Sequence, residues 1–114
     1  MAPYGWHVPS DKEWGLLTNY LGGGWVAGGK LKEAGTNHWN IPNVGGTNES
    51  GFTALPGGCR GIEGFFYGYG DNSSWWQPSD TTNILCLFLS FSDNYVRWSS
   101  NNKELGIFVR CIKD

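Results

Sequence analysis

The sequence has few charged residues, and neither sign of charge dominates. Only 16% of the 114 residues are charged, and the formal net charge is -2. About a quarter is usual for a globular domain. A chain without a basic excess has no electrostatic attraction for nucleic acid or anionic lipid. We therefore expect no nucleic-acid partner.

The sequence also lacks a long hydrophobic run. Its most apolar stretch, "ILCLFLSF", covers only residues 84–91. A membrane-spanning helix needs roughly 20 apolar residues. The run is therefore predicted to be a buried strand, and we expect no direct insertion into a membrane.

Residues that could bind a metal or carry out nucleophilic catalysis are scarce. Cys59, Cys86 and Cys111 are too widely spaced for a compact metal motif, and their odd number leaves the disulfide state open. Neither His7 nor His38 has the positioned acidic partner that a catalytic triad requires. We therefore expect no catalytic residues, no metal and no cofactor.

Glycine and tryptophan are abundant instead. The chain has 18 Gly and seven Trp, and aromatic residues make up 16%. Glycines favour turns, and bulky aromatic side chains can hold short strands and loops together. The length suits one domain, residues 1–114, with many turns and short strands.

The clearest local pattern predicts a helix between residues 9 and 22. Ser10 can cap its N-terminus, and Glu13 stands three residues later, which completes a capping box. Apolar residues follow at helical spacing on one face: Trp14, Leu17 and Leu21. The glycine at position 22 can end the helix.

Residues 26–74 give weaker signals. A second helix near 26–35 is balanced evenly against a loop, because glycines 28 and 29 each cost about 1 kcal/mol in a helix interior. The region from 36 to 74 is predicted to be an ordered loop region with a short strand near 64–69 and a turn at 71–74. We expect its large apolar residues to be buried: Trp39, Phe52, Leu55, Phe65, Phe66 and Tyr67.

The C-terminal third predicts β-structure. Residues 83–91 and 94–100 flank a turn at 92–94, and residues 106–114 form a third predicted strand. The run at 84–91 is apolar at consecutive positions. This pattern predicts a central strand that is covered on both faces.

Five stretches resemble one known family. "GWHVPSDKEW", "GGKLKEAGTNHWN", "TNESGFTALPGG", "WW" and "FVRCIKD" are similar to the Fibrobacter succinogenes major paralogous domain of Bacteroidetes surface proteins. The resemblance implies an α+β, C-type lectin-like fold, with an N-terminal helix packed on a small mixed or antiparallel sheet and long ordered loops. It also implies a location outside the cell, within a larger surface protein or pilus.

Members of this fold group also serve as variable proteins of diversity-generating retroelements. Departures from the family pattern lie mainly in the last 40 residues, for example at Gln77, Leu85, Leu87 and Trp98. We therefore expect residues 75–105 to be a variable ligand-binding segment. Ordinary drift among paralogues is the alternative explanation.

Strand alternation then suggests which side chains are displayed, because alternate residues share a face. Positions 85, 89 and 96 match structural positions of the family, so their neighbours are expected to face the ligand. The candidate ligand-binding residues are Cys86, Leu87, Phe88, Ser90, Asp93, Asn94, Tyr95, Arg97, Ser99 and Asn101. The expected function is non-catalytic recognition of an unknown protein or glycan on another cell or surface.

The sequence is also compatible with two other functions. A carbohydrate-binding domain that is not diversified could use Trp75 and Trp76 as stacking platforms, although at least one of them is expected to be buried. A calcium lectin could use Asp80, Asp93 and Asn94, which carry suitable oxygen ligands. The unbroken sugar-binding motifs of calcium lectins are absent, so turn and cap roles are favoured for these three residues.

Overall fold

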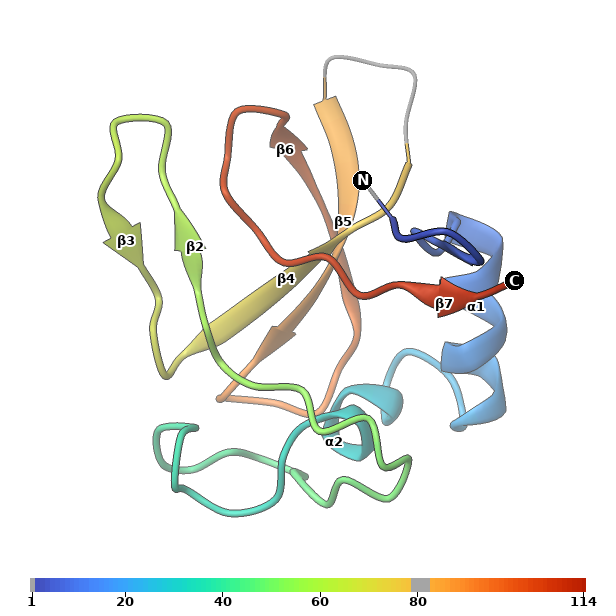
Figure 1. Cartoon of the computed structure of the whole chain (residues 1–114). Helices are drawn as coiled ribbons and strands as arrows, with labels where there is room; N and C mark the ends of the chain where they lie inside the picture. Colours follow the sequence, from blue (N-terminus) through green and yellow to red (C-terminus); the bar gives the residue numbers. More distant parts are fainter. Residues whose placement is uncertain (1, 79–82) are drawn as a thin grey trace.

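Short antiparallel β-pairs and two short helices make up the chain (Figure 1). The computed structural model describes residues 2–78 and 83–114. The elements in chain order are β1 Trp6–His7, α1 Asp11–Tyr20, α2 Ala27–Leu31, β2 Cys59–Arg60, β3 Phe66–Tyr67, β4 Asn72–Trp76, β5 Asn83–Ser90, β6 Arg97–Asn102 and β7 Ile112–Lys113. The fold is thus mixed α and β, with β-structure dominant. None of the described helices is long and apolar enough to span a membrane.

A three-stranded antiparallel sheet in the order β4-β5-β6 forms the centre of the molecule. The helix α1 lies on one side of this sheet, and the β2–β3 hairpin lies on the other (Figure 1). Leu87 of β5 pairs with Trp75 on one neighbour and with Trp98 on the other. The prediction that residues 84–91 form a central strand is confirmed.

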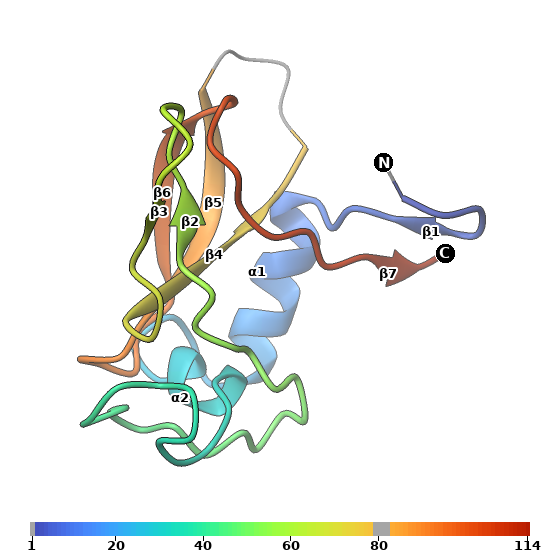
Figure 2. The ribbon, with the colours of Figure 1, turned by 60° about the vertical axis from the view of Figure 1, so that its left-hand side comes forward.

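Two predictions about strands are wrong. Residues 71–74 were expected to form a turn, but Ser73 and Ser74 are buried in β4, where they pair with Leu89 and Phe88. Within the predicted strand 106–114, only β7 is a strand, and it pairs with β1 at the other end of the chain. This pairing places the two chain ends side by side in a ribbon that projects from the body (Figure 2).

The helix α1 forms as its sequence predicts. The Ser10 side chain accepts a hydrogen bond from the Glu13 N–H, and the Glu13 carboxylate accepts one from the Ser10 N–H. Trp14 and Leu21 are buried and Leu17 is partly buried. These side chains join one core with the inner face of the sheet and with the segments at its lower end: Ala27, Leu31, Trp39, Ala54, Trp75, Leu87, Leu89 and Val96.

The glycines of α2 are explained by the chain that packs against them. A Cβ atom on Gly28 would overlap the carbonyl oxygen of Tyr95, and one on Gly29 would overlap the carbonyl oxygen of Gly45. The Gly29 N–H also donates a hydrogen bond to the Asn94 carbonyl, at 3.2 Å. Close backbone approach thus offsets the helix-propensity cost of glycine.

The expected burial of the apolar residues in the loop region holds only in part. Trp39 is buried, and its indole N–H donates to the Ala54 carbonyl at 2.9 Å. The β2–β3 hairpin instead exposes its apolar side chains, because it has two residues per strand and nothing in the described chain covers its outer face. The exposed residues are Phe65, Phe66 and Tyr67, and Leu55 is exposed nearby.

His7 connects both chain ends to α1. Its Nε2 lies 2.7 Å from a Glu13 carboxylate oxygen, and its Nδ1 lies 2.6 Å from an Asp114 carboxylate oxygen. The hydrogen bond with Asp114 raises the pKa of His7 most, and the bond with Glu13 raises it further. The imidazolium therefore holds the β1–β7 ribbon against the N-terminus of α1.

We expect Gly28→Ala to lower the free energy of unfolding by about 1–3 kcal/mol, because its methyl group would displace the backbone at Tyr95. Gly15→Ala is the matched control, because Gly15 lies in α1 and an added Cβ would meet nothing within 4 Å. It should gain up to about 1 kcal/mol from helix propensity. Urea unfolding measures both. Equal stabilisation by the two substitutions would contradict the close packing of α2.

The His7 contacts predict a pH dependence of stability. The folded pKa of His7 lies above its unfolded value of about 6.5. The stability that its two hydrogen bonds contribute is therefore fully present below about pH 6.5 and is lost as pH rises through the folded pKa. We expect the melting temperature to fall over this interval, and we expect His7→Gln to flatten the fall. His38→Gln, at the separate pair with Glu33, should leave the His7 dependence in place.

Candidate ligand-binding surface

A buried lysine holds the base of the turn between β5 and β6. Lys32 is fully buried, and its Nζ donates to the carbonyl oxygens of Val44, Ser90 and Asp93 at 2.9, 2.9 and 2.8 Å. Burial lowers the pKa of Lys32 to about 8, and the Asp93 charge opposes this shift. At neutral pH the ammonium group thus keeps all three donors and joins three chain segments.

Backbone hydrogen bonds fix the rest of this turn. The Val96 N–H donates to the Gly24 carbonyl at 2.7 Å, and the Val44 N–H donates to the Phe91 carbonyl at 3.0 Å. Together with the contact between Asn94 and α2, these bonds involve main-chain atoms of the turn. Of its side chains, that of Val96 is buried in the core, whereas those of Tyr95 and Arg97 are not tied up by these bonds.

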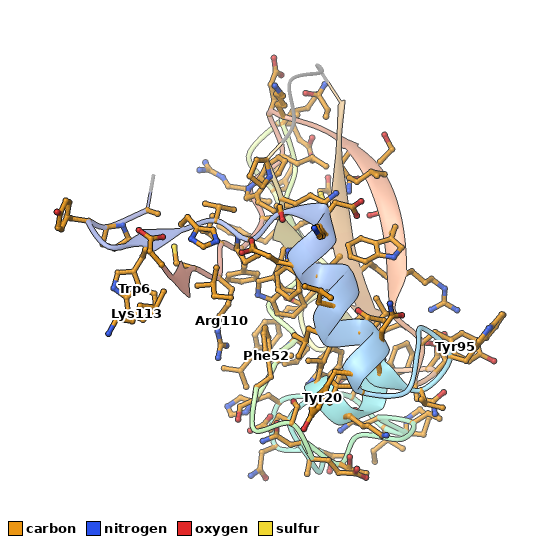
Figure 3. The ribbon with its side chains drawn as sticks, turned by 90° about the vertical axis from the view of Figure 1, so that its right-hand side faces the viewer. Trp6, Tyr20, Phe52, Tyr95, Arg110 and Lys113 are labelled. Carbon is orange, nitrogen blue, oxygen red and sulfur yellow. The ribbon has the colours of Figure 1, made fainter. Side chains whose placement is uncertain are left out.

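Three of the side chains at this end of the molecule form a surface group, the Trp25–Tyr95–Arg97 cluster. The rings of Trp25 and Tyr95 meet edge to face, with centroids 4.9 Å apart. The guanidinium carbon of Arg97 lies 5.2 Å from the Tyr95 ring centroid. Trp25 is 74% exposed, and the cluster borders a cavity of about 370 Å3. Figure 3 shows Tyr95 at the outer edge of the molecule.

Asp93 orients the arginine of this cluster. Its carboxylate lies 2.6 Å from a guanidinium nitrogen of Arg97 and also accepts the Tyr95 N–H at 3.0 Å. Burial pushes the pKa of Asp93 upward, but the hydrogen bonds from Arg97 and Tyr95 outweigh it, so the pKa lies below its usual range. The hydrogen bond with Asp93 raises the pKa of Arg97. Both groups are therefore charged at neutral pH.

The structure brings some of the predicted binding residues together. Asp93, Tyr95 and Arg97 are in contact, and Phe88 stands directly opposite Arg97 on β5, where it is half-buried. Asn94 is half-buried, with its backbone against α2, so it supports the turn.

The remaining predicted residues lie on β5 and β6 outside the cluster. Ser99 and Asn101 are half-buried on β6, and the Asn101 amide donates to the Ser99 hydroxyl at 2.9 Å. The Ser90 hydroxyl lies 2.9 Å from that of Ser92 at the end of β5. The side chains of each pair thus bond to each other, and both pairs lie outside the cluster.

The expected display of Cys86 and Leu87 to a ligand is wrong. Cys86 is fully buried, and Leu87 is 1% exposed within the core, because β5 is the central strand and is covered on both faces. Burial raises the pKa of the Cys86 thiol, against a hydrogen bond with Asn101. Leu89 is buried as expected. Leu85, which was assigned to the fold, is 44% exposed.

Trp25 was missed by reasoning from the sequence. It lies in "GGGWVAGG", outside both the predicted strands and the variable segment. The only available signal was an aromatic residue between glycines with no apolar periodicity around it. Such a residue lies in no amphipathic element that could bury it, so the sequence should be taken to predict an exposed Trp25.

The described residues give little support to a calcium site or to sugar stacking on Trp75 and Trp76. Among them, no group of three or more His, Cys, Asp and Glu side chains could hold a metal ion. Asp93 is engaged by Arg97, and Asp80 lies outside the described residues. Trp75 is 5% exposed and Trp76 is half-buried, so Trp75 offers no face to a sugar ring.

Comparison with known families gave one result. A model described as the Fibrobacter succinogenes major domain matches residues 1–113. Searches of curated proteins and of solved structures gave no match.

We expect Lys32→Met to lower the free energy of unfolding by about 2–4 kcal/mol. The change leaves three buried carbonyl oxygens without their donor, at about 1–3 kcal/mol each, and removes the cost of burying a charge. Lys12→Met, at an exposed position of α1, is the control and should change stability by less than about 0.5 kcal/mol. Urea unfolding at pH 7 measures both. A neutral Lys32→Met would show that the turn is held by other contacts.

Proposed function

The chain belongs to the Fibrobacter succinogenes major domain family, and on that premise we propose that it is a non-catalytic ligand-binding domain. Its recognition surface is the Trp25–Tyr95–Arg97 cluster, extended by Phe88. The domain acts in a larger cell-surface protein or pilus, where it binds a protein or glycan presented by another cell or surface.

The observation that carries this proposal is an exposed tryptophan that meets a half-buried tyrosine beside an oriented arginine. Leaving a tryptophan 74% exposed forgoes the burial that normally stabilises its ring. Trp, Tyr and Arg are the residue types that dominate binding hot spots. The turn that carries Tyr95 and Arg97 is held by Lys32 and by backbone hydrogen bonds, so little ordering remains to be done on binding.

The proposed fold is C-type lectin-like. Three features support it: one N-terminal helix lies against an antiparallel sheet, long ordered loops precede β4, and the two chain ends pair as β1 and β7. In this proposal the variable segment, residues 75–105, supplies Tyr95 and Arg97. The contacts that hold the turn come from outside the segment, mainly from α2 and Lys32.

Diversification by a retroelement can be tested on the gene. An adenine-rich template repeat should lie beside it, and mismatches with the segment encoding residues 75–105 should fall at template adenines. If the repeat is absent, the cluster belongs to a domain with one inherited ligand.

A carbohydrate-binding domain that is not diversified is the second candidate. The observation that favours it is Trp25, whose exposed ring could stack on a sugar ring and which lies outside the variable segment. The buried Trp75 does not contribute in this proposal.

The test is to screen the domain on a glycan array and on an array of extracellular proteins, and then to measure variants against the ligand found. We expect Trp25→Ala, Tyr95→Ala or Arg97→Ala to weaken binding by 2 kcal/mol or more at a hot-spot position, about 30-fold. For Trp25→Ala and Arg97→Ala, stability should change by less than about 1 kcal/mol, because the ring of Trp25 and the side chain of Arg97 are exposed.

Tyr20→Ala is the matched control. Tyr20 is 86% exposed and ends α1, outside the cluster. Its replacement should leave binding unchanged. A ligand whose affinity survives all three cluster substitutions would place recognition on another surface. A glycan ligand that depends on Trp25 alone would favour the second candidate.

A further inference from the structure

A second concave surface lies on the opposite side of α1 from Tyr95 (Figure 3). Two cavities, each of about 210 Å3, share Arg110 as a lining residue. We call them together the Arg110 groove. The walls of one cavity include Pro9, Trp14, Leu17 and Ile112, and those of the other include Ala54, Leu55, Trp75 and Phe108. Both walls are largely apolar.

The guanidinium group in this groove is held in place but is not neutralised. Its central carbon lies 4.0 Å from the ring centroid of Phe52, which lies beneath it. No carboxylate of the described residues lies within ion-pair distance of Arg110, whereas Arg97 has such a partner in Asp93. Stacking uses the flat face of a guanidinium group and leaves its N–H edges free to bind an anion.

One wall of the groove contains an unpaired polar group. The Trp14 side chain is 2% exposed, and its indole N–H has no hydrogen-bond partner. Buried donors without a partner are rare in folded proteins, and each one calls for an explanation. The indole nitrogen has almost no accessible surface, and Trp14 lines the cavity, so its N–H signal reports what occupies the cavity beside it rather than a direct bond to a ligand.

The charges near the groove have both signs. Glu13 lines the same cavity, and its carboxylate shares the charge of His7 with Asp114 and also accepts the Ser10 N–H. Lys113 lies on the adjoining β1–β7 ribbon, opposite Trp6 (Figure 3). Arg110 and Lys113 therefore supply two positive charges here, and the Glu13–His7–Asp114 group supplies one net negative charge when His7 is protonated.

We propose that the Arg110 groove binds a small organic carboxylate, either free or as the C-terminal carboxylate of a peptide. The carboxylate pairs with the Arg110 guanidinium. An apolar body enters the cavity beside Trp14 and Leu17. This site is independent of the Trp25–Tyr95–Arg97 cluster. A ligand binds there only if it carries both a negative charge and an apolar group.

The test uses 3-phenylpropanoate and its uncharged amide, 3-phenylpropanamide, with the intact domain. Titrations are followed by 1H–15N NMR, which reports the indole N–H of Trp14 directly. We expect the carboxylate to bind at least about tenfold more tightly than the amide and to shift the Trp14 indole signal. A tripeptide ending in Phe, with a free or an amidated C-terminus, distinguishes a peptide source from a free acid.

Arg110→Gln should weaken carboxylate binding at least about tenfold, and Arg60→Gln is the matched control. Arg60 also lies over a phenylalanine ring, at 5.7 Å from Phe66, but outside the groove. Its replacement should leave binding unchanged. The proposal is overturned if carboxylate and amide bind equally, if neither binds at millimolar concentration, or if the Trp14 signal stays fixed. The wild-type titrations decide it even if Arg110→Gln does not fold.

Discussion

The arrangement of the proposed recognition surface depends on one buried ammonium group. Taking a lysine side chain out of water costs several kcal/mol unless its charge and its donors are compensated. Lys32 meets this cost with three carbonyl oxygens, one from the loop at Val44 and two from the turn after β5, and with the Trp39 ring, whose centroid lies 5.3 Å away. Because the cost is recovered only when all the segments are in place, the loop near Val44 and the turn after β5 are ordered together.

The turn between β5 and β6 is held mainly through its main chain, and this has a functional consequence. Carbonyl and amide groups at positions 90, 93, 94 and 96 bond to Lys32, Gly29 and Gly24. Every residue type except proline supplies the same main-chain groups, so side chains at positions 95 and 97 can differ without loss of these bonds. Gly28 and Gly29 are constrained instead, because the turn lies where their side chains would be.

The elements that depend mainly on neighbouring residues could be predicted from local patterns in the sequence. The capping box of Ser10 and Glu13 specified α1, and the apolar run specified the central strand β5. The pairing of β7 with β1 and the extended form of residues 72–76 depend on partners far away in the chain, which no local signal reveals.

The candidate site was predictable only on the strand side. Asp93, Tyr95 and Arg97 followed from the hairpin, but their contact with Trp25 comes from a loop about 70 residues earlier in the chain. Strand alternation separates two faces but does not say whether a face is covered. For this reason the burial of Cys86 was not predicted. The sequence also could not distinguish the two arginines: Asp93 neutralises Arg97, whereas Arg110 stacks on Phe52 without a carboxylate partner. That difference assigns different chemistry to the two surfaces: the cluster offers aromatic rings with little free charge and suits neutral ligands, whereas the groove offers an unpaired cation and suits anions.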